Sequence, residues 1–219
     1  MPVPLIKICG INSTFALDGA IAAGADFIGL VFFAKSPRHV TGPQAAAIAA
    51  RAAGRVGVVG LFVDPAPDYL ATMLAEVQID QIQLHGHESP AEVVAIGARH
   101  GLPMWKALGV RTRADVTQAD RYAGAAARVL FDAKPPEGAD LPGGNGLRID
   151  WAMLKGVRPA LPWMLAGGLD PENVGDALAL TGAPAVDVSS GVENAPGAKD
   201  AGRMTAFCTA VRNTGQGAP

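Results

Sequence analysis

The sequence has few cysteines, few aromatic residues and little charge of either sign. Its 219 residues include only two cysteines, Cys9 and Cys208, which are too far apart to suggest a disulfide framework or a zinc knuckle. Aromatic residues make up 5%, charged residues 17%, and the formal net charge is -2, so we expect no binding of nucleic acid or of an anionic membrane. These shortages favour a reducing, cytoplasmic compartment and a small molecule as the ligand.

Long apolar runs are also missing, although 49% of the residues are hydrophobic. No run approaches the ~20 residues of a membrane-spanning helix, and the start of the chain, Met1-Pro2-Val3-Pro4, lacks the basic region of a signal peptide. The hydrophobic residues are therefore expected to form a core. We expect one catalytic domain over residues 1–212, followed by a frayed tail over residues 213–219.

Short apolar runs alternate with Ala- and Leu-rich segments of helical spacing along the whole chain. Eight such runs are centred on Ile6, Gly29, Val59, Gln83, Lys106, Leu130, Leu165 and Val188. Most are apolar on both faces, as in residues 56–63, which is typical of parallel strands covered on both sides. The pattern predicts an α/β fold, a single (βα)8 TIM barrel. An open doubly wound sheet would need a Gly-rich phosphate turn where this chain has Cys9-Gly10-Ile11-Asn12.

Two turns rich in Gly and Ser follow the seventh and eighth apolar runs. In barrels of this kind, phosphate is commonly bound by the loops after strands seven and eight. Either turn alone would be explained as an ordinary turn, but both together at these positions favour an anion site formed by backbone N–H groups and hydroxyls. The expected phosphate-binding residues are Gly167, Gly168, Ser189, Ser190 and Gly191.

Cys9 and Asp132 stand at the ends of the first and sixth apolar runs, where barrel enzymes carry their catalytic groups. Lys7 shares the face of Cys9 in a strand, so its cation would favour the thiolate. A thiolate and a carboxylic acid on opposite sides of the barrel mouth suit acid–base isomerisation. The alternatives are an inert buried thiol, and a carboxylate that caps a helix or pairs with Lys134.

Four further side chains are expected to face the substrate. The guanidinium of Arg38, after the second run, suits bidentate binding of a carboxylate, the alternative being a solvated loop arginine. Lys7 is expected to pair with Asp187, because the first and eighth strands are neighbours in a closed barrel. His85 and His87 lack a third ligand at suitable spacing, so we expect no metal site and interpret His85 as a pocket-lining residue.

The sixth connection is long and rich in glycine. Such a loop in a compact enzyme is more often a functional lid than a random insertion. We expect Gly144, Asn145 and Gly146 to belong to this lid.

With these residues located, the chain resembles the phosphoribosylanthranilate isomerase family over essentially its whole length. The resemblance rests on an ordered set of motifs: KICGI at 7–11, GADFIG at 24–29, SPR at 36–38, QLHG at 83–86, LAGGL at 165–169 and VDVSSGVE at 186–193. Residues 143–146 read GGNG where the family usually has GGTG, and Asn12 stands where a Thr is common. Neither departure removes an acid, a base or an anion ligand.

The resemblance implies an Amadori rearrangement in tryptophan biosynthesis, from N-(5-phosphoribosyl)anthranilate to 1-(2-carboxyphenylamino)-1-deoxyribulose 5-phosphate. It implies Cys9 as the general base, Asp132 as the general acid and Arg38 as the partner of the anthranilate carboxylate, with no cofactor and no metal. We expect a monomer or a homodimer. A metal-dependent phosphosugar epimerase would need a cluster of carboxylates and histidines that the strand ends do not offer. A noncatalytic phospholigand-binding domain would not need both Cys9 and Asp132.

Overall fold

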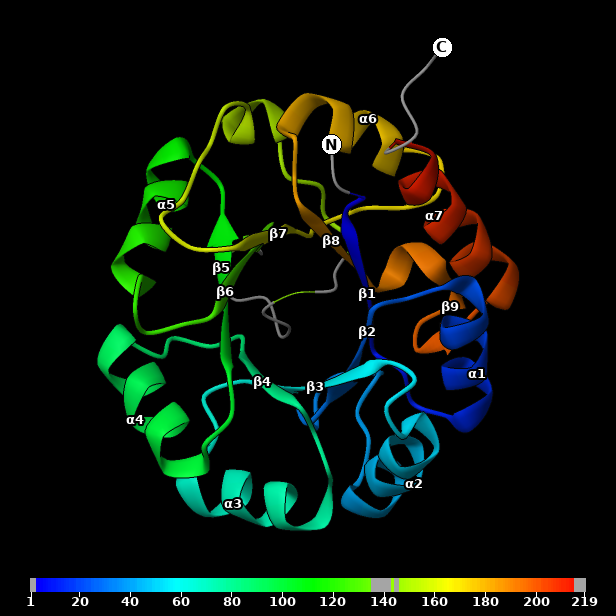
Figure 1. The fold of residues 1–219 in the computed structure, drawn as a ribbon, viewed down its shortest axis with the longest axis vertical. Coiled ribbons are helices and arrows are strands. Elements are labelled where there is room, and N and C mark those ends of the chain that lie inside the picture. The colour runs from blue at the N-terminus through cyan, green and yellow to red at the C-terminus, as the bar shows by residue number, and fades with distance from the viewer. Residues whose placement is uncertain (1–2, 135–142, 144–145, 215–219) are drawn as a thin grey trace.

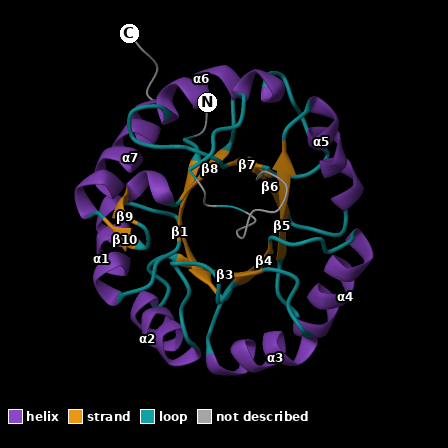
Figure 2. Ribbon diagram, turned by 180° about the vertical axis from the view of Figure 1, so that it is seen from behind, coloured by secondary structure: helices purple, strands orange, loops and turns teal. Residues whose placement is uncertain are grey.

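Eight parallel strands close into a barrel in the order β1 to β8, with β8 pairing back to β1 (Figures 1 and 2). This computed structural model describes residues 3–134, 143 and 146–214. The strands are β1 (Leu5–Cys9), β2 (Phe27–Val31), β3 (Gly57–Phe62), β4 (Gln81–Leu84), β5 (Met104–Val110), β6 (Arg128–Ala133), β7 (Trp163–Leu165) and β8 (Ala185–Val188). The predicted (βα)8 barrel is therefore confirmed.

Helices form an outer ring around the strands, as Figure 2 shows. They are α1 (Thr14–Ala23), α2 (Gly42–Ala52), α3 (Pro67–Glu76), α4 (Pro90–His100), α5 (Arg113–Thr117), α6 (Val174–Thr181) and α7 (Ala201–Thr214). Three 3-10 turns, η1 (Gln118–Tyr122), η2 (Trp151–Leu154) and η3 (Ser190–Val192), and a small hairpin of β9 (Glu193–Ala195) and β10 (Ala198–Lys199) complete the described elements. Among the described residues, no helix combines the length and the apolar character needed to span a membrane.

Local sequence signals explain where the helices begin and end. The hydroxyl of Ser13 accepts a hydrogen bond from the Ala16 N–H at 3.1 Å and caps α1, and Gly24 ends that helix with φ +85°, a conformation that glycine adopts without strain. Ser89 and Glu92 form a reciprocal capping box at the start of α4. Helices α1 and α4 thus begin shortly after the ends of β1 and β4.

The barrel interior is divided into an apolar lower part and a polar upper part. Side chains from most of the strands fill the lower part: Val59, Trp105, Ala107, Leu130, Met164 and Ala185. Phe27 packs edge-on against Trp105, with ring centroids 5.1 Å apart. This apolar layer closes the barrel beneath the pocket. The polar residues lie above it, at the carboxyl ends of the strands.

Helix α7 closes the ring by packing against α1. Arg212 donates hydrogen bonds to the carbonyl oxygens of Pro4 and Gly24 at 3.2 and 2.9 Å, which ties the last helix to the start of the barrel. The helix ends at Thr214, and the rest of the expected tail, residues 215–219, lies outside the described residues. The domain limits of 1–212 and 213–219 stay a prediction.

Candidate active site

A pocket opens at the carboxyl ends of the barrel strands. The predicted site residues that line it are Cys9, Arg38, His85, Asp132, Gly146, Gly167, Gly168, Asp187, Ser189 and Ser190. Lys7 is completely buried, and Gly191 is not part of the lining. Gly144 and Asn145 of the predicted lid lie outside the described residues. Residues that are far apart in sequence thus meet at one mouth.

Lys7 connects the ends of β1 and β8. Its ammonium lies 2.9 Å from Asp187 Oδ1, which confirms the predicted pairing, and it also interacts with the Cys9 thiol. Gly29 of β2 leaves room for this arrangement, because an added Cβ there would lie 2.8 Å from Cys9 Sγ and 3.2 Å from Lys7 Nζ. Thiol, ammonium and carboxylate therefore form a continuous buried cluster.

Burial decides the resting state of this cluster. Burial lowers the pKa of Lys7, but Asp187 and Cys9 together raise it above its ordinary value, so the ammonium stays charged. The pKa of the Cys9 thiol is also raised, mainly by burial, although Lys7 and Lys199 pull it down. The expected effect of Lys7 is present, yet it is smaller than the cost of burying a thiolate. Cys9 therefore rests as a neutral thiol at neutral pH.

Asp132 of β6 and His85, which follows β4, meet on the other side of the mouth. The His85 Nε2 atom lies 3.3 Å from Asp132 Oδ2, and Asp132 Oδ1 accepts a hydrogen bond from the Ala133 N–H at 2.8 Å. Gly143 lies directly above the pair, since an added Cβ on it would overlap Asp132 Oδ2 and lie 2.8 Å from His85 Nε2. In the closed barrel, β7 and β8 separate Asp132 from Cys9 on one side. The acid and the thiol thus come from different walls.

The two predicted phosphate loops contact each other. Gly167 and Gly168 follow β7 with φ +80° and +68°, values that favour glycine. Asn173 holds this loop by donating to the Gly168 carbonyl oxygen at 3.0 Å and accepting from the Asp170 N–H at 3.0 Å. An added Cβ on Gly191, in the loop after β8, would overlap the Leu169 carbonyl oxygen. Gly191 is therefore needed for the packing of one loop on the other.

Replacing Gly191 by Val should separate the two loops and weaken phosphate binding. The physical cause is the overlap with the Leu169 backbone, which must move before any larger side chain fits. We expect a higher dissociation constant for a ribulose 5-phosphate analogue, measured by calorimetry, together with a lower melting temperature. Gly175→Val is the matched control, because an added Cβ on Gly175 meets no atom within 4 Å. Parental affinity in the folded Gly191→Val protein would remove this loop from the assignment.

Arg38 is held by a buried ion network that the sequence analysis missed. Its Nε and Nη2 atoms both lie 2.8 Å from the Glu193 carboxylate, and Lys199 lies 2.6 Å from Glu193 Oε1. Lys199 also donates to the Ser189 carbonyl oxygen at 3.0 Å, so the β9–β10 hairpin supports the phosphate loop. Burial opposes ionisation of Glu193, but Arg38 and Lys199 hold its pKa below the usual range. Glu193 closes the VDVSSGVE motif, which is the only sequence signal for its importance.

One wall of the pocket is apolar. Val31 and Leu61 are buried beside Cys9, and Phe33 and Val63 pack against them. All four side chains line the pocket. A flat aromatic ring fits such a wall.

A comparison with known proteins identifies the family to which these features belong. The model of N-(5'phosphoribosyl)anthranilate isomerase matches residues 6–210. The chain belongs to this family. An N-(5'-phosphoribosyl)anthranilate isomerase of Paramagnetospirillum magneticum is 54% identical over 212 residues, which cover 97% of this chain and 98% of the relative. The predicted family, enzyme class and isomerase function in tryptophan biosynthesis are confirmed at this level.

Solved structures of the isomerase family share the barrel. Monomers generated from the dimeric enzyme of Thermotoga maritima superpose with a TM-score of 0.81 at 32% identity, covering 96% of this chain and 99% of that one. An isomerase in complex with reduced 1-(o-carboxyphenylamino)-1-deoxyribulose 5-phosphate superposes with a TM-score of 0.80 at 30% identity, covering 96% and 99%. These structures support the barrel fold of this chain.

Proposed function

We propose that this chain converts N-(5-phosphoribosyl)anthranilate to 1-(2-carboxyphenylamino)-1-deoxyribulose 5-phosphate, with Asp132 as the acid and Cys9 as the base. The observation that carries the assignment is the position of a carboxyl and a thiol on different walls of one pocket, next to two loops rich in Gly and Ser. A fluorescence assay that follows the anthranilate group during conversion tests the activity. A noncatalytic binding domain would bind the substrate and leave its fluorescence unconverted.

The first step opens the furanose ring. Protonated Asp132 donates its proton to the ring oxygen, the C1–O bond breaks, and the lone pair of the anthranilate nitrogen forms a C1=N bond. His85, 3.3 Å from the Asp132 carboxyl, orients the donor. The product of this step is a protonated Schiff base, in which the C2–H bond has become acidic.

The second step removes the C2 proton. The thiolate of Cys9 accepts it, the C–H electrons form a C1=C2 bond, and the nitrogen recovers its lone pair. The enolamine then gains a proton at C1 and loses the proton of the C2 hydroxyl, which gives the ketose. Because Lys7 stabilises the thiolate, it lowers the cost of deprotonating Cys9 before the step.

The two ends of the substrate meet different surfaces. The loops that carry Gly168 and Ser190 bind the phosphate, and the apolar wall of Val31 and Leu61 packs against the anthranilate ring. Arg38 binds the anthranilate carboxylate from the same side. Because Glu193 already fixes its guanidinium, Arg38 loses little side-chain freedom when the substrate binds.

Replacing Arg38 by Met should weaken substrate binding by about 1.5–3 kcal/mol, the scale of a hydrogen bond to a charged group. Steady-state kinetics should therefore show a higher KM. The matched control is a substrate analogue with aniline in place of anthranilate, whose KM should be insensitive to the change because it has no carboxylate. An equal loss with both substrates would mean that Arg38 serves only to pair Glu193.

The proposal extends to assembly and compartment. We infer a cytoplasmic location from the low cysteine content. We also infer a monomer or a homodimer, since a related isomerase, that of Thermotoga maritima, is dimeric. Analytical ultracentrifugation of the purified chain distinguishes the two assemblies.

A further inference from the structure

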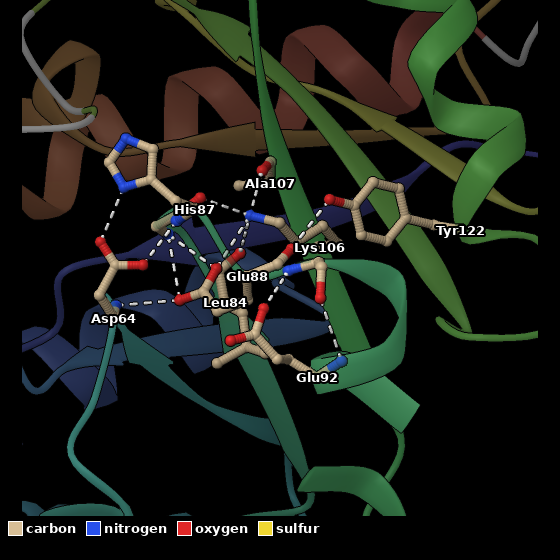
Figure 3. A network of polar contacts seen from close by, with 10 residues as sticks. Asp64, Leu84, His87, Glu88, Glu92, Lys106, Ala107 and Tyr122 are labelled. Carbon is tan, nitrogen blue, oxygen red and sulfur yellow. Dashed lines mark hydrogen bonds and ion pairs between the residues drawn. The ribbon is translucent and has the colours of Figure 1, made fainter. Parts of the chain in front are cut away.

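A second buried ion pair lies outside the pocket, between β5 and the connection from β4 to α4. Lys106 of β5 is 2% exposed, and its Nζ lies 3.0 Å from Glu88 Oε2. The same ammonium donates to the carbonyl oxygens of Gly86 at 2.7 Å, Ala107 at 3.0 Å and Leu84 at 3.5 Å. Figure 3 shows Lys106 between Glu88, Leu84 and Ala107. The ammonium therefore binds the backbone on both sides of residue 85.

Glu88 attaches the same connection to two further segments. Its Oε2 accepts from the Gly86 N–H at 3.0 Å, and its Oε1 accepts from the Asp64 N–H at 2.9 Å, after β3. The Tyr122 hydroxyl of η1 donates to the Glu88 carbonyl oxygen at 2.9 Å (Figure 3). The connection is thus fixed from β3, β5 and η1 together.

The residue between the two bound carbonyls is His85. Its backbone N–H donates to the Phe62 carbonyl oxygen at 2.8 Å, and its ring Nε2 lies 3.3 Å from Asp132 Oδ2. Neither Lys106 nor Glu88 lines the pocket at the mouth. The backbone around His85 therefore links the pair to the pocket.

We propose that Lys106 and Glu88 are positioning residues that aim the His85 ring at Asp132 and so hold the general acid toward the substrate. The inference rests on the proposed role of Asp132. A buried ion pair is weak evidence for stability, since apolar residues of similar volume often stabilise a fold as well. The charges are better explained by geometry, because the three N–H bonds of the ammonium can serve the Gly86 and Ala107 carbonyls and the Glu88 carboxylate at once, with the Leu84 carbonyl at 3.5 Å sharing one of them.

The test separates positioning from stability by comparing Lys106→Met, Glu88→Gln and the double variant. Lys106→Met leaves the Glu88 charge buried and unpaired, so it should lower both the melting temperature and kcat. In the double variant the unpaired charge is gone, so we expect the melting temperature to recover in part, with the unbound carbonyls keeping it below the parent. The kcat per folded molecule should stay about tenfold or more below the parent, because the carbonyls beside His85 are still unbound. Recovery of kcat together with stability would leave only a structural role.

A double-mutant cycle with His85→Gln decides the route. If the pair acts through His85, Lys106→Met should lower kcat about tenfold in the parent and less than about twofold in the His85→Gln background. Equal factors in both backgrounds, or parental kcat in His85→Gln, would overturn the proposal. Cys208→Ala, in the buried face of α7 and remote from the mouth, provides a control for general destabilisation.

The same assays distinguish this proposal from the assignment of the acid. An Asp132→Asn protein that keeps parental kcat means that the acid is wrongly assigned. If Asp132→Asn is inactive but Lys106→Met lowers kcat by the same factor in the parent and in His85→Gln, the acid is correctly assigned and only the positioning role of Lys106 and Glu88 fails.

Discussion

Replacing Asp132 by Asn should lower kcat by about 10²-fold or more, the usual contribution of a positioned acid. The amide keeps the shape of the carboxyl, and its oxygen can still accept the hydrogen bond from the Ala133 N–H. It has no proton to deliver to the furanose oxygen, so ring opening should become the slow step. Single-turnover fluorescence measurements with the anthranilate substrate would show the loss directly.

Substrate binding should survive this change. The phosphate loops and the apolar wall do not depend on the Asp132 charge, so the dissociation constant of a reduced product analogue should stay near the parental value. Asp18→Asn is the matched control, because Asp18 lies on α1, does not line the pocket, and pairs with Arg51 through a side chain that is 41% exposed. Near-parental turnover by a folded Asp132→Asn protein would exclude Asp132 as the acid.

The barrel and the mouth were predictable because they follow from periodic features. Parallel strands covered on both faces read as continuous apolar runs, and the closure of the barrel makes β1 and β8 neighbours. Because β1 and β8 are neighbours, the alternation of side chains along each strand was enough to predict that Lys7 and Asp187 would pair. The loops after β7 and β8 were also predictable, because the number of strands that precede each loop fixes its place in the barrel.

The ion pairs that hold the site from outside were not predictable. Arg38 and Glu193 are brought together by the β9–β10 hairpin, an irregular element that no periodicity signals. Lys106 follows a buried tryptophan in an apolar strand, and nothing in the sequence indicates that its ammonium reaches Glu88. Such contacts depend on the exact path of loops, which local patterns do not determine.

The protonation state of Cys9 was also beyond sequence reasoning. A cation two residues away suggested a thiolate, and the ammonium does lie against the thiol. The extent of burial decides the outcome, and burial depends on Val31, Leu61 and the other side chains packed around the sulfur.

Replacing Cys9 by Ser should lower kcat by about 10²-fold or more, because an alcohol does not ionise at useful pH and the C2 proton then has no base. In the parent, the active form carries the Cys9 thiolate and the protonated Asp132 together, so kcat/KM should follow a bell-shaped pH profile. Burial raises the pKa of Cys9 and so places the upper, falling limb above the ordinary range of a thiol. Lys7→Met removes a charge that lowers this pKa, so the upper limb should move to higher pH. Cys208→Ala should leave both the rate and the profile unchanged, because Cys208 is buried in the face of α7 that packs on the barrel.

An inert core thiol predicts a different set of results. Cys9→Ser would then lower the melting temperature and leave turnover per folded molecule unchanged, and the pH profile of Lys7→Met would match that of the parent. If Cys9 is the base, Cys9→Ser should keep its melting temperature, because the serine hydroxyl nearly fills the place of the thiol, and should lose turnover, because the reaction loses its proton acceptor. The pH profile of Lys7→Met should then differ from that of the parent. Circular dichroism to establish folding and a pH series of kcat/KM for these proteins therefore decide between the two roles, and a folded Cys9→Ser protein with near-parental turnover would exclude Cys9 as the base.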